Sequence, residues 1–259
     1  MLIRSIAVFG IVLSSASNGA DFSFRPPSPG GLSFPSVVVS GEIQRGDYER
    51  LQSFVRKDSD RFRSSILVLA SPGGDLFEAI KIGNMIKASY GHVSVYERVG
   101  VCASACFLIY VAAVSRSATP PSIGIHRPYF DPHYFSKLPV AQAEVKHKEL
   151  MRKIRGYLEE REVPQYLIEK MFSLSSDEVY WLTYNDLDRI GLRANWYDQL
   201  LVDRCKLNKQ LEQGFLKEGS RFRFADEARV NIAHVAQCES HLTFTEGASN
   251  LRKLLSPGR

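Results

Sequence analysis

The chain has 259 residues, of which 44% are hydrophobic and 24% are charged, as is usual for a globular protein. This length suits one large domain with an appendage, or two small domains. The formal net charge of +5 comes from basic residues that are scattered and mixed with acidic ones, whereas a nucleic-acid surface needs a denser basic face. We therefore expect no nucleic-acid partner.

The N-terminus has the layout of a secretory signal peptide over residues 1–20. A short positive start precedes an apolar run at residues 6–13, and small residues follow it. The apolar run is too short to span a bilayer comfortably, and cleavage after Ala16 or Ala20 would fit the pattern. We therefore expect a periplasmic or secreted protein. The alternative is a protein anchored in the membrane by an uncleaved signal.

Residues 21–35 are rich in Pro, Ser, Gly and Phe, which predicts an extended or mobile lead-in. The β-branched run from Val37 to Ile43 predicts the first strand. Asp47 then stands where it can cap a helix that continues through Arg56. The main domain is therefore expected to begin at residue 36.

A glycine-rich turn follows the next predicted strand. Residues 65–70 form a continuous apolar run, as expected of a strand buried on both faces. Ser71-Pro72-Gly73-Gly74 comes directly after it, and Asp75 can cap the helix that follows. Taken alone, Pro-Gly is a common type II turn. Its position between a buried strand and a helix is nevertheless where open α/β sheets place their sites.

Strand and helix patterns continue to alternate beyond this turn. Strands are expected at residues 93–96, 122–126 and 179–182, and helices at 103–113, 140–160, 164–171 and 186–190. Alternation at this spacing implies parallel strands joined by crossover connections. The sequence thus predicts an α/β fold with a main domain at residues 36–202 and a small C-terminal appendage at residues 203–259.

Ser104 and His126 are the chemically informative side chains. Ser104 stands among small residues at the start of a buried helix, where a serine often serves only close packing. A lone histidine such as His126, at the end of an apolar strand, is likewise more often a packed residue than a catalyst. A hydroxyl, an imidazole and a glycine-rich turn with free N–H groups are, however, the parts that acyl transfer requires. Because each of them ends its own element, the pattern favours a hydrolase with a nucleophilic serine.

Three segments together resemble the family of the Clp protease proteolytic subunit: Ser71-Pro72-Gly73-Gly74, Ala103-Ser104-Ala105 and Gly124-Ile125-His126-Arg127-Pro128. The similarity covers roughly residues 37–195 and extends to the broader crotonase-type superfamily. It implies a ClpP/crotonase-like spiral of ββα units. It also implies that Ser104 is the nucleophile and His126 the general base. The backbone N–H groups of Gly73 and Ala105 would stabilise the oxyanion, and Gly74 would shape the turn.

The third member of the triad is where the chain departs from this family. The family has an aspartate shortly before its Phe/Trp-Leu-Ser/Thr stretch, and an ungapped alignment places Val179 there. Asp177 and Glu178 lie just before it, and Asp177 is our candidate acid. Without an orienting acid, a serine–histidine pair works more slowly because the imidazole tautomer is not held.

Four cysteines in an exported chain favour disulfide pairing. Cys205 and Cys238 are expected to close a loop in the C-terminal region. Cys102 and Cys106 flank Ser104 one helical turn apart, where regular helix geometry makes a disulfide awkward and a distorted helix start would permit it. The alternative is that this second pair consists of small buried thiols.

These observations predict an exported, ATP-independent serine peptidase that acts on peptides or unfolded protein segments. No cofactor, no metal and no ATPase partner are expected, and the fold class favours a homo-oligomer. One alternative is a non-catalytic binding or scaffold protein of the same fold that has lost the triad acid. The other is a crotonase-like acyl-CoA enzyme.

Overall fold

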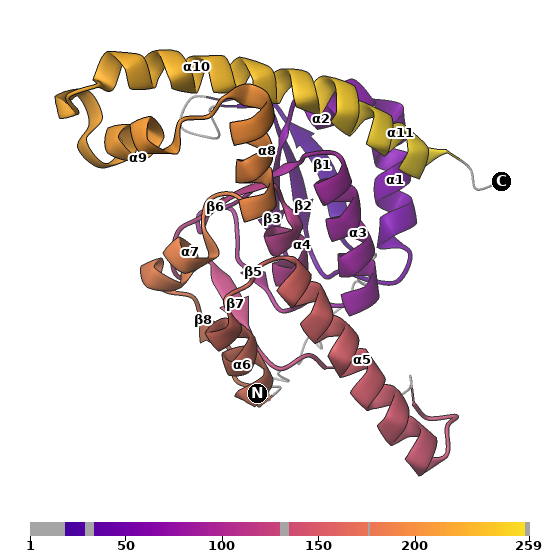
Figure 1. Cartoon of the computed structure of the whole chain (residues 1–259). Helices are drawn as coiled ribbons and strands as arrows, with labels where there is room; N and C mark the ends of the chain where they lie inside the picture. Colours follow the sequence, from indigo (N-terminus) through magenta and orange to yellow (C-terminus); the bar gives the residue numbers. More distant parts are fainter. Residues whose placement is uncertain (1–18, 29–33, 130–134, 176, 257–259) are drawn as a thin grey trace, which may run out of the picture.

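The structure is a computed structural model that describes residues 19–28, 34–129, 135–175 and 177–256 (Figure 1). The strands of its larger sheet are β1 (Asp21–Arg25), β2 (Ser36–Ser40), β3 (Ile66–Ala70), β4 (His92–Val95) and β6 (Ser115–Ala118). They lie in the order β1-β2-β3-β4-β6, and all neighbours are parallel except β1 and β2. The expected parallel sheet is therefore confirmed.

Strand β1 differs from the expectation of a lead-in over residues 21–35. It pairs with β2 along its full length, from Asp21 opposite Ser40 to Arg25 opposite Ser36. Phe22 and Phe24 alternate along it and contact the Phe54 ring, at centroid distances of 6.1 and 4.6 Å. This alternation is a strand signal that the high Pro, Ser and Gly content of the segment obscured.

A smaller sheet carries the residues of interest. It consists of β5 (Cys102–Ala103), β7 (Ile123–Ile125) and β8 (Tyr180–Trp181) in the order β5-β7-β8. β5 and β7 are parallel, and β7 and β8 are antiparallel. The chain enters β5 after the larger sheet's β4 and leaves it directly into a buried helix.

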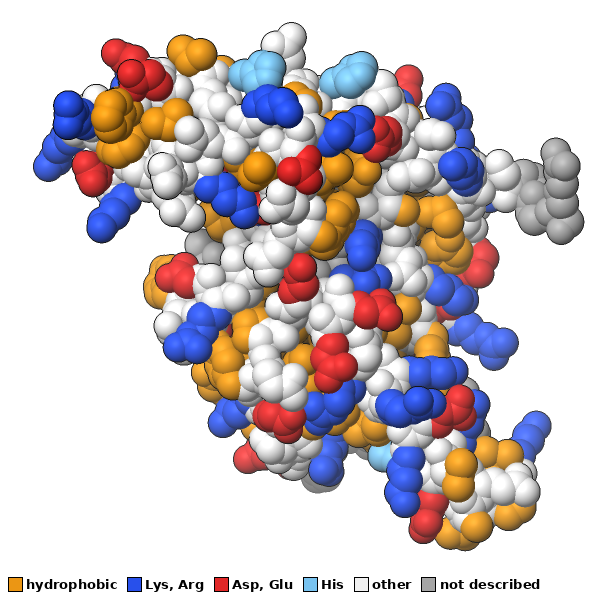
Figure 2. Space-filling model, viewed as in Figure 1, with side chains coloured by type: hydrophobic (Ala, Val, Ile, Leu, Met, Phe, Trp, Pro, Cys, Tyr) orange, Lys and Arg blue, Asp and Glu red, His pale blue; other side chains and the backbone are white. Residues whose placement is uncertain are grey.

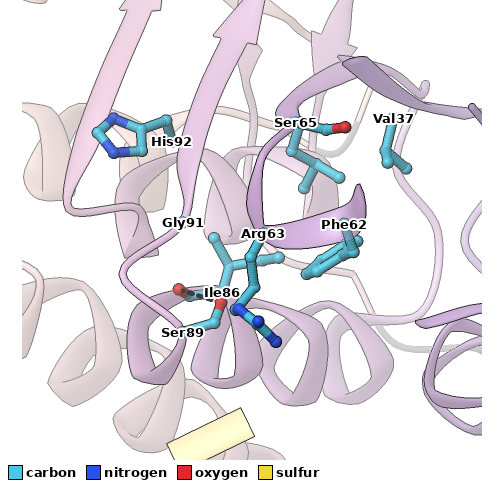
Figure 3. A pocket seen from close by; sticks show the side chains of 9 residues that line it. Val37, Phe62, Arg63, Ser65, Ile86, Ser89, Gly91 and His92 are labelled. Carbon is cyan, nitrogen blue, oxygen red and sulfur yellow. Dashed lines mark hydrogen bonds between the residues drawn. The ribbon is translucent and has the colours of Figure 1, made fainter. Parts of the chain in front are cut away.

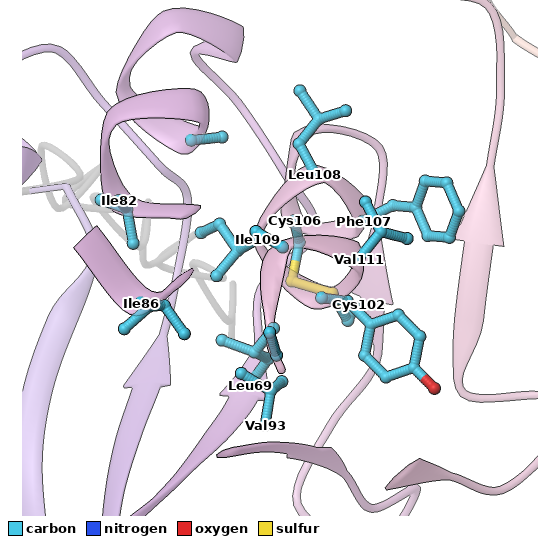
Figure 4. Close-up of a cluster of buried hydrophobic side chains, with 14 of the residues drawn as sticks. Leu69, Ile82, Ile86, Val93, Cys102, Cys106, Phe107, Leu108, Ile109 and Val111 are labelled. Atoms are coloured by element: carbon cyan, nitrogen blue, oxygen red, sulfur yellow. A yellow bond between two sulfur atoms is a disulfide. The ribbon is translucent and has the colours of Figure 1, made fainter. Parts of the chain in front are cut away.

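Helices cover and connect the two sheets. Their bounds are α1 Asp47–Lys57, α2 Ser59–Arg63, α3 Leu76–Ala88, α4 Ala105–Ala112, α5 Val140–Glu160, α6 Gln165–Ser173, α7 Tyr184–Ile190, α8 Asn195–Cys205, α9 Lys209–Glu218, α10 Ala225–Leu242 and α11 Ala248–Leu255. Every residue of α4 is buried, and the Tyr157 hydroxyl of α5 donates a hydrogen bond to Leu108 O at 3.1 Å. Helix α4 is thus the centre of the core (Figure 4).

Two aspartates were expected to cap helices, and the structure separates them. Asp75 caps α3 by accepting hydrogen bonds from the N–H groups of Phe77 and Glu78. Asp47 does not cap α1, because Gly46 occupies the N-cap position with φ 95°. The Asp47 carboxylate is instead buried and accepts a hydrogen bond from Ala20 N at 2.9 Å. It therefore ties the start of the described chain to the core.

The C-terminal region is helical and packs against the rest of the protein. The boundary placed after residue 202 falls inside α8, and α10 and α11 run along one side of the molecule (Figure 1). Leu251 of α11 joins the main core, whereas Tyr197 of α8 and Leu242 of α10 belong to a second cluster. In the described ranges, no helix combines the length and the apolar character that a bilayer crossing requires.

The face of the molecule seen in Figure 2 mixes charges of both signs. Lys and Arg side chains are interleaved with Asp and Glu over this face, and no continuous basic surface is visible there. This distribution agrees with the scattered basic residues of the sequence.

Candidate active site

Ser104 lies in the turn between β5 and α4 and has a strained backbone. Its φ of 56° and ψ of −125° lie outside the regions that residues with a Cβ normally adopt. The turn is held by backbone hydrogen bonds, including Ser104 N to Gly124 O at 3.0 Å and Ala103 N to Ser71 O at 3.0 Å. A strained serine in a strand-to-helix turn is the geometry that exposes a nucleophilic hydroxyl.

The Ser104 hydroxyl is not used for structure. Ser104 is the N-cap residue of α4, a position where serine usually caps the helix, yet its side chain makes no capping hydrogen bond. Among the described residues, its hydroxyl has no hydrogen-bond partner, and the residue is only half-buried. The hydroxyl is therefore available for chemistry.

The glycine-rich turn packs directly against Ser104. Gly73 has φ 108°, and a Cβ built on it would lie 2.6 Å from Ser104 Cβ and 2.9 Å from Ala105 N. Only glycine permits this approach. The other side of the turn is fixed by Ile43, whose N–H donates to Gly73 O at 2.7 Å. The tertiary structure thus brings together two segments 31 positions apart, Gly73 and Ser104.

The candidate oxyanion donors differ in availability. Gly73 N–H donates a hydrogen bond to the buried Ser71 hydroxyl at 3.1 Å. Within the described part of the chain, Gly74 N–H and Ala105 N–H have no acceptor. The Ala105 N–H also lies at the start of α4, where the helix dipole favours negative charge. Ala105 is therefore the better prepared of the two donors that the resemblance implies.

Replacing Gly73 with alanine should disrupt both stability and reactivity. The added methyl group would collide with Ser104 and Ala105, and the positive φ adds strain, so we expect a loss of about 2 kcal/mol or more in the free energy of unfolding. Gly156→Ala is the matched control, because nothing lies within 4 Å of its Cβ position in α5, and it should raise stability by about 0.5–1 kcal/mol. Urea denaturation measures both. Equal stability of the two variants would contradict this packing.

His126 follows β7, whose Gly124 pairs with Ala103, the residue before Ser104. The imidazole is half-buried, and its Nδ1 lies 2.8 Å from the carbonyl oxygen of Arg127. Since a carbonyl only accepts, Nδ1 carries the proton and Nε2 is left as the basic nitrogen. No hydrogen bond joins Ser104 to His126 in the described structure. The two residues nevertheless follow adjacent parallel strands, β5 and β7, at the same end of the smaller sheet.

The register between β7 and β8, continued by one step toward His126, reaches an apolar side chain. β7 and β8 pair Gly124 with Trp181 and Ile125 with Tyr180, so the next step of this antiparallel register places Val179 opposite His126. The Val179 side chain lies on the same face of the smaller sheet as a Gly124 side chain would, since Val179 Cγ1 is 2.8 Å from a Cβ built on Gly124. No carboxylate stands at this position.

Asp177 and Glu178 are exposed, and both carboxylates bond to Ser175. These hydrogen bonds lower the pKa of each carboxyl group. Among the described residues, neither carboxylate contacts His126. The structure therefore does not bring Asp177 to the imidazole, and its role as the triad acid stays a prediction.

The four cysteines form two disulfides. Cys205–Cys238 joins α8 to α10, as expected, with Cα atoms 5.5 Å apart. Cys102–Cys106 is also formed and spans Ser104, with Cα atoms 5.3 Å apart. The distorted helix start that this bridge needs is provided by the unusual backbone of Ser104.

Another half-buried histidine, His92, lies apart from Ser104 and the glycine-rich turn. It lines a small cavity with Arg63, Ser89 and other residues at the start of the parallel strands (Figure 3). Ser71, in contrast, follows the opposite end of β3. The cavity has a volume of about 10 Å³, which holds one water at most. Burial lowers the pKa of His92, against the opposing effect of Glu239. A substrate does not fit there.

Comparison with known proteins adds family information. A model of the Clp protease family matches residues 36–188. No curated protein matches the chain. Among solved structures, it is similar to a mutant of the 1510-N membrane-bound stomatin-specific protease, with 19% identity, a TM-score of 0.41, and coverage of 65% of this chain and 82% of that one. It is also similar to a mutant of ClpP1 from Listeria monocytogenes, with 23% identity, a TM-score of 0.42, and coverage of 60% and 86%.

Proposed function

The chain belongs to the Clp protease family, and from this we propose that it is a serine peptidase with Ser104 as nucleophile and His126 as general base. Its mixed α/β fold is of the ClpP and crotonase type. One observation carries the proposal above all: Ser104 has a strained backbone and a hydroxyl without a partner in the described structure. Gly73 and the strand that leads to His126 adjoin it.

The proposed reaction follows from this arrangement. Ser104 Oγ attacks the substrate carbonyl while His126 Nε2 takes its proton, and the protonated imidazole then gives that proton to the leaving amine. Ala105 N–H stabilises the developing oxyanion, and Gly73 N–H joins it by exchanging the Ser71 hydroxyl for the substrate oxygen. Water then hydrolyses the acyl-enzyme by the same route. No cofactor is needed in these steps.

We propose peptides or unfolded protein segments as substrates, cleaved without an ATPase partner. This part rests on the signal-like N-terminus, because ATP is not expected outside the inner membrane. Proteins of this family usually form oligomers, which supports a homo-oligomer here.

Export gives a prediction at the N-terminus of the mature protein. Residues 1–18, which carry most of the predicted signal, lie outside the described residues. Ala20 is fully buried and its N–H bonds to Asp47, so cleavage after Ala20 would remove a residue of the core. This supports cleavage after Ala16. Mass spectrometry of the exported chain should therefore show a mature form that retains Ala20, and a mature form starting at Asp21 would contradict this.

A fluorophosphonate probe tests the proposed chemistry. We expect one adduct per chain in intact-mass spectra, with the Ser104 Oγ–P bond formed and fluoride released. Ser104→Ala should abolish the adduct and peptide hydrolysis. Ser122→Ala is the matched control, since the Ser122 hydroxyl is buried and has no hydrogen-bond partner among the described residues, so its loss should leave labelling unchanged.

A non-catalytic binding protein of the same fold is the second candidate. The observation that favours it is Val179, which stands where an orienting acid would be needed. Folded wild-type protein that neither labels nor hydrolyses peptides would support this candidate over the peptidase.

A further inference from the structure

We propose that the Cys102–Cys106 disulfide positions the nucleophile, so that Ser104 is fully reactive only while this bridge is intact. The inference rests on the proposed function of Ser104 and adds a redox dependence to it. The bridge joins Cys102, the first residue of β5, to Cys106 in the first turn of α4, and Ser104 lies at the middle of the loop that it closes. The other disulfide has no such relation to the site.

The backbone of Ser104 needs to be held. Its φ of 56° is unfavourable for a residue with a Cβ, and such a conformation persists only where the surroundings impose it. β5 has only two residues, and the hydrogen bonds that restrain the turn in the described structure include Cys102 N to Ser122 O at 2.8 Å, Ala103 N to Ser71 O at 3.0 Å, Ser104 N to Gly124 O at 3.0 Å and Phe107 N to Ser104 O at 3.0 Å. A covalent link across the turn further restrains the backbone conformation of Ser104.

The disulfide anchors this turn to the rigid core. Cys106 is fixed within α4, whose residues are all buried, and Cys102 is itself fully buried (Figure 4). With the two Cα atoms held 5.3 Å apart, the Ser104 backbone cannot relax to an extended form, because that would separate the cysteines beyond the span of a disulfide. The bridge therefore blocks relaxation of the strained turn to an extended backbone.

Reduction removes this restraint without changing the sequence. A dithiol such as dithiothreitol supplies two electrons and two protons, the S–S bond breaks, two thiols form, and the dithiol becomes its cyclic disulfide. The turn is then held by its hydrogen bonds and by the packing of Gly73 against Ser104. Ser104 would relax toward an ordinary backbone conformation and lose its alignment with His126 and the oxyanion donors.

The test compares two disulfide deletions in the full chain. Cys102→Ala/Cys106→Ala removes the bridge at the turn, and Cys205→Ala/Cys238→Ala removes the one between α8 and α10 as a matched control. Labelling at several fluorophosphonate concentrations separates the maximal rate from the apparent affinity. We expect the first variant to lose about ten-fold or more in maximal rate with its apparent affinity unchanged, and the control to keep both.

Dithiothreitol added to the folded control variant provides the same comparison without a folding problem. Only Cys102–Cys106 can be reduced there, and the appearance of two thiols is followed by mass. Labelling should fall on reduction and return on reoxidation. Unchanged labelling after complete reduction overturns the inference, as does a lower melting temperature of Cys102→Ala/Cys106→Ala with an unchanged maximal rate.

Failure of the proposed function is distinguishable from failure of this inference. If oxidised wild-type protein does not label at all, the peptidase proposal fails. Amide hydrogen exchange then tests whether the bridge restrains the Ser104 backbone. Peptides that contain Ser104 should exchange faster in the Cys102→Ala/Cys106→Ala variant than in the control. Equal exchange overturns the positioning role.

Discussion

His126→Ala should lower the rates of peptide hydrolysis and of probe labelling by about a thousand-fold or more. Nε2 is the nitrogen left to take the Ser104 proton, because Nδ1–H donates a hydrogen bond to Arg127 O at 2.8 Å. In the described structure, the half-buried ring forms a hydrogen bond only with this neighbouring carbonyl, so the fold should survive. Steady-state hydrolysis of a fluorogenic peptide and labelling kinetics measure the loss.

Two controls separate base catalysis from a structural role of His126. His234→Ala removes an exposed imidazole from α10 and should leave both rates unchanged. Imidazole added to the His126→Ala variant should restore part of the labelling rate, since a free base can occupy the space left by the ring. A His126→Ala variant as active as the wild type would remove this residue from the mechanism.

Val179→Asp should increase the hydrolysis rate by roughly ten- to one-hundred-fold, because it places a carboxylate opposite His126. In the wild-type chain, a backbone carbonyl is the only group seen to hold the imidazole within the described residues. A carboxylate there would stabilise the imidazolium that forms during the reaction. Val179 is about 41% exposed, so the substitution does not bury a charge.

The pH profile gives the second signature of Val179→Asp. A nearby negative charge favours the protonated imidazole and raises the pKa of its conjugate acid. The deprotonated form is the base, so the rise of activity with pH should move to higher pH in this variant. Val179→Asn, which has the same shape without the charge, should shift neither the rate nor the profile.

Asp177→Asn examines the alternative acid. Its carboxylate bonds to Ser175 and not to His126, so the substitution should leave the hydrolysis rate unchanged. A large loss of activity would show instead that Asp177 completes the triad after a movement of its loop.

Much of the larger sheet could be predicted from the sequence, because β2 and β3 contain continuous apolar runs. β6 could not, since Ser115–Ala118 is polar and its buried Arg116 argues against a core strand. The guanidinium is accommodated because it donates hydrogen bonds to the carbonyl groups of Val111, Ile190 and Gly191. Those acceptors come from the ends of two helices, which no local pattern reveals.

By itself, the sequence determined the three elements that present Gly73, Ser104 and His126, because each is a local strand end or helix start whose composition predicts its conformation. It also pointed to the family to which the chain belongs. Only the tertiary structure decided that Val179 lies beside Gly124, where the β7–β8 register continued by one step reaches His126, and that a disulfide spans Ser104. These two features depend on strand register and on backbone geometry at a single strained residue, and both are set by the packing of segments that are distant in the chain.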